Sequence, residues 1–268
     1  TNAWTLDHWR LYFAQLDEWD CVVSQDSSAP PGFSKSLKLT TGTAEGGLDN
    51  DHYGYIDTKL EGYDVQRLGY GAGTAKSATL SFWVRSSQTG TFGFTIFRGE
   101  TQDRAINLPY AISSADTWEK KTIVVPGDTS DAITETNTER MRLVWGIIAG
   151  SNFTSSSAGS TWFDYNSSGQ YLAGHVQNGV ALNGSATWYI TGVKFELGST
   201  ATDFDHQRYS DDLRRCQRYY YRITNTDNIY LTLVRDSTEY KRLTVAHPTT
   251  MRANPTVTIL ASDADGDA

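Results

Sequence analysis

The sequence has few cysteines, few prolines and no long apolar run. Its 268 residues include two cysteines and six prolines, and no stretch approaches the roughly 18 consecutive apolar residues of a membrane-spanning helix. Cys21 and Cys216 form no CxxC pair, so neither a zinc site nor a disulfide framework is indicated. We expect two free thiols in a reducing cytoplasm, with a single Cys21–Cys216 disulfide as the alternative.

Positive charge is also scarce. The chain has 23 Lys and Arg residues against 31 Asp and Glu residues, which gives a net charge of −8. A nucleic-acid partner requires a basic stripe, and the one basic stretch, Arg214, Arg215 and Arg218, is short. The five histidines lack the spacing of metal ligands or of a catalytic triad. These absences predict no nucleic-acid partner, no insertion into a membrane and no catalytic residues.

Strand-forming residues dominate what is present. Aromatic residues make up 12% of the chain, and alternation of apolar and polar residues predicts six strands. These strands are 36–40, 78–85, 91–98, 117–126, 140–149 and 187–197. The turn at 88–90 predicts that the second and third of them pair as a β-hairpin. Frequent strands joined by Gly, Ser, Asn and Asp turns predict an all-β fold, an antiparallel β-sandwich of the jelly-roll type.

Residues 151–186 interrupt this pattern with a polar stretch rich in Ser, Gly and Asn. A loop of this length in a compact domain is either functional or poorly ordered. Its aromatic rings could stack on the apolar face of a sugar, beside amides and carboxylates that bond to hydroxyls. The candidates for glycan binding are Trp162, Asp164, Tyr165 and Tyr171. The alternative is that these rings pack under the loop as a separate cluster, or contact a neighbouring subunit.

The clearest helix of the chain is predicted at 210–219, where apolar residues recur at helical spacing and Ser210 is the expected N-cap. Short strands are predicted after this helix at 229–234, 242–245 and 256–260. These features predict two domains. A jelly roll occupies 1–208, and a short helix with a small β-rich region at 209–268 serves oligomerisation or attachment.

Acidic residues offer candidate sites for a metal ion and for catalysis. Asp49 and Asp51 supply closely spaced oxygens of the kind that calcium prefers, whereas the acidic stretch at 263–267 is expected to be a flexible tail. Glu196 could act as the general acid of a glycan-cleaving site, but no second carboxylate can be placed opposite it. We therefore expect a solvated or salt-bridged Glu196 and a protein that is not an enzyme.

Four stretches resemble the carbohydrate-binding modules of the family 4/9-like type. They are GFSKSLKL at 32–39, SFWV at 81–84, the strand that begins at Trp118, and YITGVKFE at 189–196. The last stretch has Thr191 and Gly192 where these modules usually carry a pair of aspartates. The resemblance implies a jelly roll that binds a glycan, and structural calcium is common among such modules.

A longer stretch resembles tail-fibre and minor structural proteins of tailed bacteriophages, particularly marine ones. It runs from ITGVKFELGS at 190–199, through FDH at 204–206, to CQRYY at 216–220. Residues 247–257 are similar to a downstream part of such proteins. A contiguous match of this length is more specific than a short motif, and it extends from the last predicted strand into the helix.

This second resemblance implies a virion protein, such as a tail fibre or related appendage, assembled in the host bacterial cytoplasm. It implies a homotrimer, other virion proteins as partners, and attachment to polysaccharide on the host surface. No cofactor is implied, apart from structural calcium. Two alternatives stay open: a polysaccharide depolymerase domain of a tailspike, and a scaffold or decoration protein without a glycan ligand.

Overall fold

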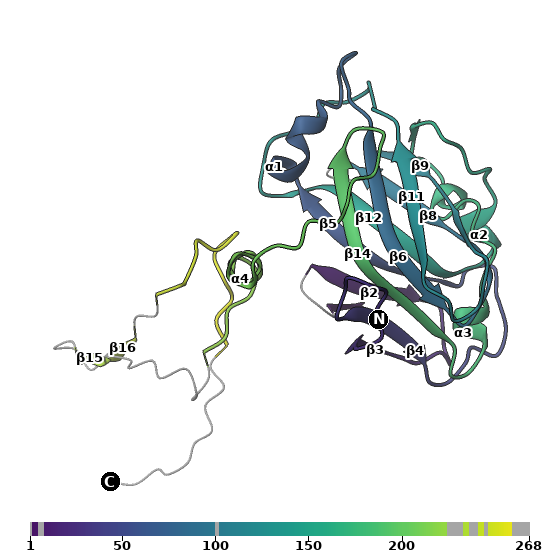
Figure 1. The fold of residues 1–268 in the computed structure, drawn as a ribbon, viewed down its shortest axis with the longest axis horizontal. Coiled ribbons are helices and arrows are strands. Elements are labelled where there is room, and N and C mark those ends of the chain that lie inside the picture. Colours follow the sequence, from purple (N-terminus) through teal and green to yellow (C-terminus); the bar gives the residue numbers. More distant parts are fainter. Residues whose placement is uncertain are drawn as a thin grey trace, which may run out of the picture. The chain divides into compact units, whose positions relative to one another are not determined.

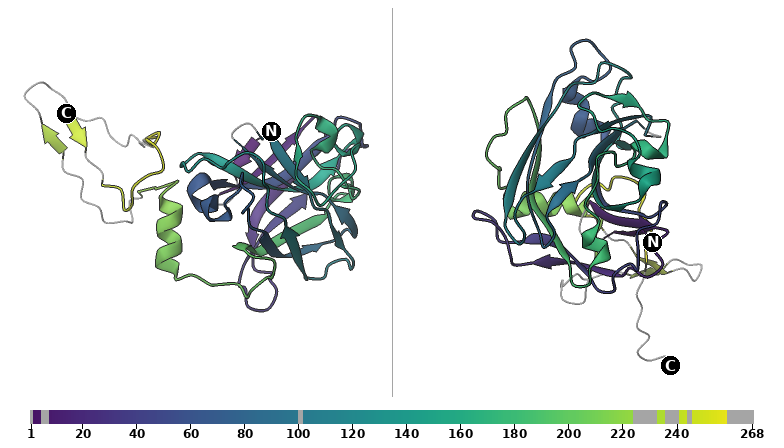
Figure 2. Two further views of the ribbon diagram at one scale, coloured as in Figure 1. Left: turned by 90° about the horizontal axis from the view of Figure 1, so that it is seen from above. Right: turned by 90° about the vertical axis from the view of Figure 1, so that its right-hand side faces the viewer.

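The computed structural model describes residues 2–4, 8–99, 102–223, 233–235, 241–243 and 246–258. The chain divides into two compact units, Thr1–Phe204 and Asp205–Ala268, and each unit is described by itself. The first unit holds two large antiparallel sheets that lie face to face (Figures 1 and 2). Within the described ranges, no helix is long and apolar enough to cross a membrane.

The larger sheet has seven strands in the order β1-β2-β5-β12-β8-β9-β13. All neighbouring strands in it are antiparallel. Its strands are β1 (Asn2–Trp4), β2 (Trp9–Ala14), β5 (Tyr53–Glu61), β12 (Glu139–Ala149), β8 (Phe94–Arg98), β9 (Arg104–Asn107) and β13 (Phe163–Asp164). The central strand β12 lies between β5 and β8 and has register irregularities near both of its ends.

The smaller sheet has five strands in the order β11-β6-β14-β4-β3, again all antiparallel. They are β11 (Glu119–Val125), β6 (Ala78–Ser86), β14 (Thr187–Leu197), β4 (Ser36–Thr41) and β3 (Cys21–Asp26). A separate pair joins β7 (Gly90–Phe92) to β10 (Tyr110–Ile112). The two packed sheets confirm the predicted antiparallel β-sandwich.

Helices in the first unit are short and lie in the connections between strands. They are α1 (Gly62–Val65), α2 (Ser151–Thr154), α3 (Gly179–Leu182) and the 3-10 turns at Gln66–Leu68 and Ser168–Gln170. Residues 151–182 therefore contain single helical turns, with β13 as their one short strand. This segment covers part of the seven-stranded sheet.

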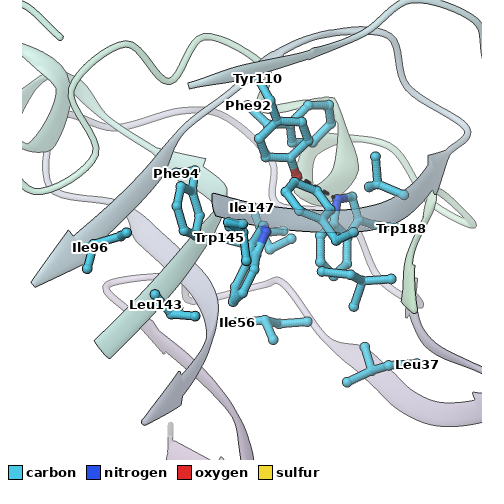
Figure 3. Packing of buried hydrophobic residues seen from close by; sticks show 14 of the residues in the cluster. Leu37, Ile56, Phe92, Phe94, Ile96, Tyr110, Leu143, Trp145, Ile147 and Trp188 are labelled. Carbon is cyan, nitrogen blue, oxygen red and sulfur yellow. Dashed lines mark hydrogen bonds between the residues drawn. The ribbon is translucent and has the colours of Figure 1, made fainter. Parts of the chain in front are cut away.

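The core lies between the two sheets and is built from the inward rows of both (Figure 3). Trp145 of β12 is fully buried, with its ring centroid 4.9 Å from that of Phe94 and 5.3 Å from that of Trp9. Trp188 of β14 is also fully buried, and its Nε1 donates a hydrogen bond of 3.3 Å to the hydroxyl of Tyr110. Each ring of this size removes a large apolar area from water, which stabilises the core.

The predicted β-hairpin between 78–85 and 91–98 is wrong. Strand β6 belongs to the five-stranded sheet, between β11 and β14, whereas β8 belongs to the seven-stranded sheet, between β12 and β9. Both strands carry a continuous apolar row that is fully buried, including Phe82 on β6 and Ile96 on β8. Because the strands lie in different sheets, both rows face the same core, whereas a hairpin would place them side by side in one sheet.

The second unit contains α4 (Tyr209–Gln217) and the antiparallel pair β15 (Leu233–Arg235) with β16 (Lys241–Leu243). The helix begins one residue earlier than predicted, so its N-cap is Arg208 and Ser210 lies within its first turn. The short strands overlap two of the predicted ones. Residues 256–258 form no strand, and the rest of that predicted strand, with the acidic stretch at 263–267, lies outside the described residues.

Candidate functional site

The outer face of the seven-stranded sheet collects tyrosines and ionised side chains. Alternation along β2 and β5 turns one row of each strand toward the core and the other row outward. The register places Tyr12 opposite Tyr55 and Arg10 opposite Asp57, so the outward rows lie side by side. Tyr53, two residues before Tyr55, extends the same face. The three tyrosines and Arg10 each combine an apolar body with one polar end, which suits a surface that is both apolar and hydrogen-bonding.

We call Tyr12, Tyr53 and Tyr55 the tyrosine platform. The rings of Tyr12 and Tyr55 stack with centroids 5.2 Å apart and an interplanar angle of 18°. The hydroxyl of Tyr53 donates to that of Tyr12 over 3.2 Å, and both of these side chains are half-buried. Burial raises the pKa of Tyr53 above its ordinary value, so this phenol stays protonated and able to donate.

Beside the platform, five charged residues form an alternating chain that we call the charge chain. It consists of Arg10, Asp57, Arg142, Glu139 and Lys59. Nε of Arg10 donates to Oδ1 of Asp57 over 2.9 Å, and its Nη2 pairs with the other oxygen. Arg142 lies 3.6 Å from Asp57 and donates to Glu139 over 2.8 Å, and Nζ of Lys59 is 2.6 Å from Glu139.

The charge chain is largely removed from water. The side chain of Asp57 is fully buried, and those of Arg10 and Arg142 are only about a tenth exposed. Burial by itself would lower the pKa of Arg10. The hydrogen bond and the charge of Asp57 raise the pKa by more than burial lowers it, so it lies above its ordinary value. Because an unpaired buried charge is costly, the mutual pairing holds these side chains in one arrangement. The hydrogen-bonding groups of this face are therefore preorganised.

Residues 151–177, which we call the covering segment, pass over the remaining part of the same face. Oγ1 of Thr95 donates to the backbone carbonyl of Tyr171 over 2.8 Å, and Nδ2 of Asn107 donates to that of Gln170 over 3.0 Å. The ring of Tyr171 is 9% exposed and lies 4.7 Å from that of Phe97. The sheet thus binds the covering segment through its own side chains.

His175 fixes the end of the covering segment. Its Nδ1 accepts a hydrogen bond of 2.9 Å from the backbone N–H of Gly93. A Cβ at Gly146 would come within 2.8 Å of the same nitrogen, so glycine leaves the space in which the imidazole fits. Burial lowers the pKa of His175 to about 4. The histidine is therefore neutral at physiological pH and acts as an acceptor.

The four residues predicted from sequence divide between two surroundings. Tyr165 and Tyr171 lie with the aromatic cluster beside the platform, their ring centroids 6.1 Å apart. Trp162 is half-buried against Tyr70, and its Nε1 donates to the carbonyl of Pro126 over 2.7 Å.

Asp164 has a side chain that is 79% exposed and paired with Arg104. Tyr171 and Trp162 pack against other aromatic rings, and a role of all four residues in glycan binding stays a prediction.

Of the acidic residues considered for calcium and for catalysis, Asp49 and Asp51 are exposed to solvent, whereas Glu196 is partly buried. The side chain of Asp49 is 81% exposed and lies 3.7 Å from Nε2 of His52, and Asp51 is exposed. Among the described residues, no three His, Cys, Asp or Glu side chains gather as metal ligands would. Glu196 is salt-bridged, as expected: Nζ of Lys194 is 3.4 Å away, and Thr202 donates to it through its backbone N–H over 2.8 Å.

A cavity of about 300 Å³ lies between β2 of one sheet and β3, β4 and β14 of the other. Its lining consists of Trp9, Gln25, Lys35, Ser36, Leu37, Ile190, Thr191, Gly192 and Val193. The hydroxyls of Ser36 and Thr191 already donate to backbone carbonyls, over 2.6 and 2.8 Å. With an apolar floor and two of its hydroxyls already engaged, this cavity suits a sugar less well than the tyrosine platform does.

Sequence reasoning missed most of the outer face. WRLYFA at 9–14 and YGYIDTKLE at 53–61 were not among the predicted strands, although both alternate with a period of two. The signal is masked because tyrosines on the outward row are themselves large and apolar, so neither row of these strands is plainly polar. The positions of Arg10 and Asp57 on the same parity as the tyrosines could have marked that row as outward-facing.

Comparison with known proteins gives the following. No family model and no curated protein matches the chain. Among solved structures, the enzymatically active domain of tailspike protein 4 from bacteriophage CBA120 matches 71% of this chain and 19% of its own, with 14% identity and a TM-score of 0.40. The family 11 carbohydrate-binding module from Clostridium thermocellum matches 74% of this chain and 92% of its own, with 11% identity and a TM-score of 0.37.

The CBM22-1 xylan-binding domain from Paenibacillus barcinonensis Xyn10C matches 74% of this chain and 90% of its own, with 11% identity and a TM-score of 0.35. This chain therefore spans about a fifth of the tailspike chain and nearly all of the two modules. At these identities and TM-scores, the similarity assigns neither a ligand nor an activity.

Proposed function

We propose that the first unit binds a polysaccharide through the outer face of its seven-stranded sheet and does not cleave it. The observation that carries this proposal is the tyrosine platform beside the buried charge chain. The half-buried rings of Tyr12 and Tyr53 offer apolar area at little cost in side-chain entropy. At the partly exposed end of the charge chain, Lys59 and Glu139 supply a donor and an acceptor for hydroxyl groups. Sugars need both kinds of contact at once.

The absence of cleavage is part of the proposal. Glycoside hydrolysis needs a carboxylic acid that gives up a proton and a second carboxylate across the bond. The two carboxylates of the charge chain, Asp57 and Glu139, both accept from arginine side chains instead. Glu196 is ion-paired with Lys194, and the hydrogen bonds from Thr202 and that pairing lower its pKa despite the opposing effect of burial. A depolymerase is the alternative that an assay of product release would reveal.

We infer further that the protein belongs to a virion, as part of a tail fibre or related appendage assembled in the host bacterial cytoplasm. The resemblance of residues 190–220 to tail-fibre proteins supports this placement. The second unit would join copies of the chain as a homotrimer or bind other virion proteins. No residue of α4 is buried, and Tyr209 is 80% exposed. A helix of nine residues is marginal by itself, so it gains from a partner.

An array of bacterial surface polysaccharides tests the binding proposal. We expect wild-type protein to retain at least one polysaccharide, and Tyr12→Ala to weaken that binding about tenfold, the effect of losing one stacked ring. Binding at wild-type strength by Tyr12→Ala, or no binding across the array, would contradict the proposal and favour a scaffold without a ligand. Light scattering over a range of concentrations tests the trimer, which a monomer throughout would exclude.

A further inference from the structure

The covering segment is paired with the seven-stranded sheet through one short strand. That strand, β13, pairs with β9 over two residues, and the other elements of the segment are single helical turns. Further along the segment, Oγ1 of Thr95 and Nδ2 of Asn107 hold its backbone carbonyls. Regions with few backbone hydrogen bonds to their surroundings open locally at a lower free-energy cost than the paired strands beneath them. We therefore expect the covering segment to open without unfolding of the sandwich.

The surface beneath the covering segment continues the face of the tyrosine platform. One buried cluster spans both layers and includes Tyr55, Phe97 and Val144 of the sheet with Tyr171 and Leu172 of the segment. The ring centroid of Tyr171 lies 4.7 Å from that of Phe97 and 5.5 Å from that of Tyr55. Displacement of the segment would thus uncover the ring of Phe97 and the two donors that now bind the segment.

His175 lies at the end of the covering segment that borders solvent. It is buried, whereas the next residue, Val176, is 71% exposed. Because Nδ1 of His175 accepts from the backbone N–H of Gly93, this nitrogen carries no proton in the closed segment. A Cβ at Gly93 or Gly146 would come within 2.9 Å of the His175 side chain, so the ring has little space in which to turn. A proton on Nδ1 would therefore set two N–H groups against each other.

Among the described residues, no charged side chain contributes to the pKa of His175. The ring of Phe92 lies edge-on to the imidazole with centroids 6.1 Å apart, and the two glycines that border it carry no side chain. Burial lowers the pKa, and hydrogen bonds to Asn178 and to the backbone of Gln177 oppose this effect only in part, so the pKa is about 4. An opened segment would return the imidazole to water and to its ordinary pKa of 6.5.

We propose that the covering segment opens in acid, when His175 takes up a proton, and that its opening lengthens the polysaccharide-binding face. Protonation removes the hydrogen bond to Gly93 and leaves a buried positive charge with no ion-pair partner among the described residues. Opening brings that charge into water and uncovers Phe97 beside the tyrosine platform. This inference rests on the proposed function, to which it adds a dependence on pH.

Hydrogen exchange of backbone amides tests the opening directly. The reporters in the segment are Leu172 and Val176, whose N–H groups donate to the carbonyls of Phe153 and Thr91. Val144, in the central strand β12, reports unfolding of the whole sandwich. Protection factors, which remove the intrinsic effect of pH on exchange, are compared at pH 7.5 and pH 5. We expect the segment to be less protected than Val144 at both values and to lose about thirtyfold in protection in acid.

His175→Gln is the informative variant, with His52→Gln as its matched control. A glutamine oxygen can accept from Gly93 but does not titrate, so the loss of protection in acid should disappear from His175→Gln. His52 is also buried but lies outside the covering segment, so His52→Gln should keep the loss. Calorimetry with a long polysaccharide fragment is the second measurement. Wild type should bind it several-fold more tightly at pH 5 than at pH 7.5, and His175→Gln equally at both.

Three results would overturn this inference and leave the proposed function standing. Equal protection of the segment and Val144 at both pH values would mean that the segment opens only when the sandwich unfolds. Loss of protection in acid that persists in His175→Gln would mean that another group causes the opening. Exchange that responds to acid while affinity does not would refute the link to the binding face. Absence of polysaccharide binding at both pH values would instead contradict the proposed function.

Discussion

The ion pairs on the two outer faces of the sandwich differ in how far they are buried. On the seven-stranded sheet, Asp57 is fully buried between Arg10 and Arg142, whose side chains are about a tenth exposed. On the five-stranded sheet, Lys38 and Asp26 form an ion pair of 3.3 Å in which both side chains are 26% exposed. Buried pairs hold their geometry because separation is costly, whereas exposed pairs are screened and exchange partners with water.

Their aromatic residues differ in the same sense. Tyr189, on the five-stranded sheet, is 6% exposed and has Nζ of Lys38 5.4 Å and Cζ of Arg85 5.1 Å from its ring centroid. Its ring is thus already occupied by cations of the same chain. Tyr12 and Tyr53 are half-buried and hydrogen-bonded to each other. The comparison teaches that the two faces differ in how much aromatic surface reaches solvent, because Tyr189 is buried whereas Tyr12 and Tyr53 are half-buried.

The largest effect is expected when the buried chain is broken. Asp57→Ala should lower the free energy of unfolding by about 3–5 kcal/mol, because it leaves two largely buried guanidinium groups without their shared carboxylate. Urea denaturation of wild type and variant measures the difference. A loss below about 1 kcal/mol would show that the charge chain is effectively solvated, and the contrast between the faces would disappear.

The next largest effect is a loss of stability at low pH. It arises from His175 in the covering segment, which lies on the seven-stranded sheet. The pKa of His175 is lowered by burial from 6.5 to about 4. Between these values the unfolded chain binds a proton that the folded chain does not, so stability is full above about pH 6.5 and falls as the pH drops. We expect a loss of about 2 kcal/mol from His175 between about pH 7.5 and about pH 5.

His175→Gln is the matched variant for this prediction. A glutamine oxygen can accept the hydrogen bond from Gly93 but does not titrate. Urea denaturation at both pH values should therefore show a smaller pH dependence in the variant than in wild type, by about the same 2 kcal/mol. An unchanged pH dependence would mean that His175 is not buried as described.

A smaller effect separates the faces in binding. Tyr53→Ala should weaken polysaccharide binding about tenfold, or about 1.4 kcal/mol, through the loss of one stacking ring. Trp83→Ala is the control, because Trp83 is half-buried on the outer face of the five-stranded sheet. Calorimetry with circular dichroism as a check on folding gives both values. If Tyr53→Ala and Trp83→Ala lost equal affinity for the polysaccharide, binding could not be assigned to the seven-stranded sheet.

The smallest effect is expected for the exposed ion pair. Asp26→Ala removes a carboxylate whose pKa is lowered chiefly by the backbone N–H of Ser28, with Lys38 contributing. Since the pair with Lys38 is partly exposed, its loss should cost under about 1 kcal/mol. Urea denaturation of Asp26→Ala and Asp57→Ala in parallel compares the two losses in the free energy of unfolding. If Asp26→Ala lowered the free energy of unfolding by about 3 kcal/mol or more, the ion pairs on the two faces would contribute equally to stability, and the contrast between them would be wrong.

Sequence patterns predicted the sandwich because its long strands alternate strongly. Strands β6 and β12 each have an unbroken apolar row, whereas the apolar row of β14 changes parity at the register shift between Thr191 and Lys194. The positions of all three strands agree with the predictions to within a few residues. Pairing was less predictable, since a turn after β6 looks the same whether the chain stays in one sheet or crosses to the other. The two cases are distinguished by the strand pairing, in which β6 lies between β11 and β14 whereas β8 lies between β12 and β9.

The candidate site was harder to predict because it joins residues that are distant in sequence. Arg10, Asp57 and Arg142 come from three strands that are neighbours only in the folded sheet. The residues next to Tyr171 in the sequence are those of an exposed polar loop. In the folded protein, however, the ring of Tyr171 is buried against Tyr55 and Phe97. Such contacts depend on strand order, which local periodicity does not specify.

The most direct test of the central claim is the position of a bound oligosaccharide on the two faces. Backbone amide chemical shifts would be followed during titration with a fragment of a polysaccharide that the array retains. We predict shifts in β2, β5 and β12, near Tyr12, Asp57 and Arg142, with β6 and β11 unchanged. Shifts confined to β6 and β11, or to the cavity lined by Lys35 and Ile190, would contradict the account.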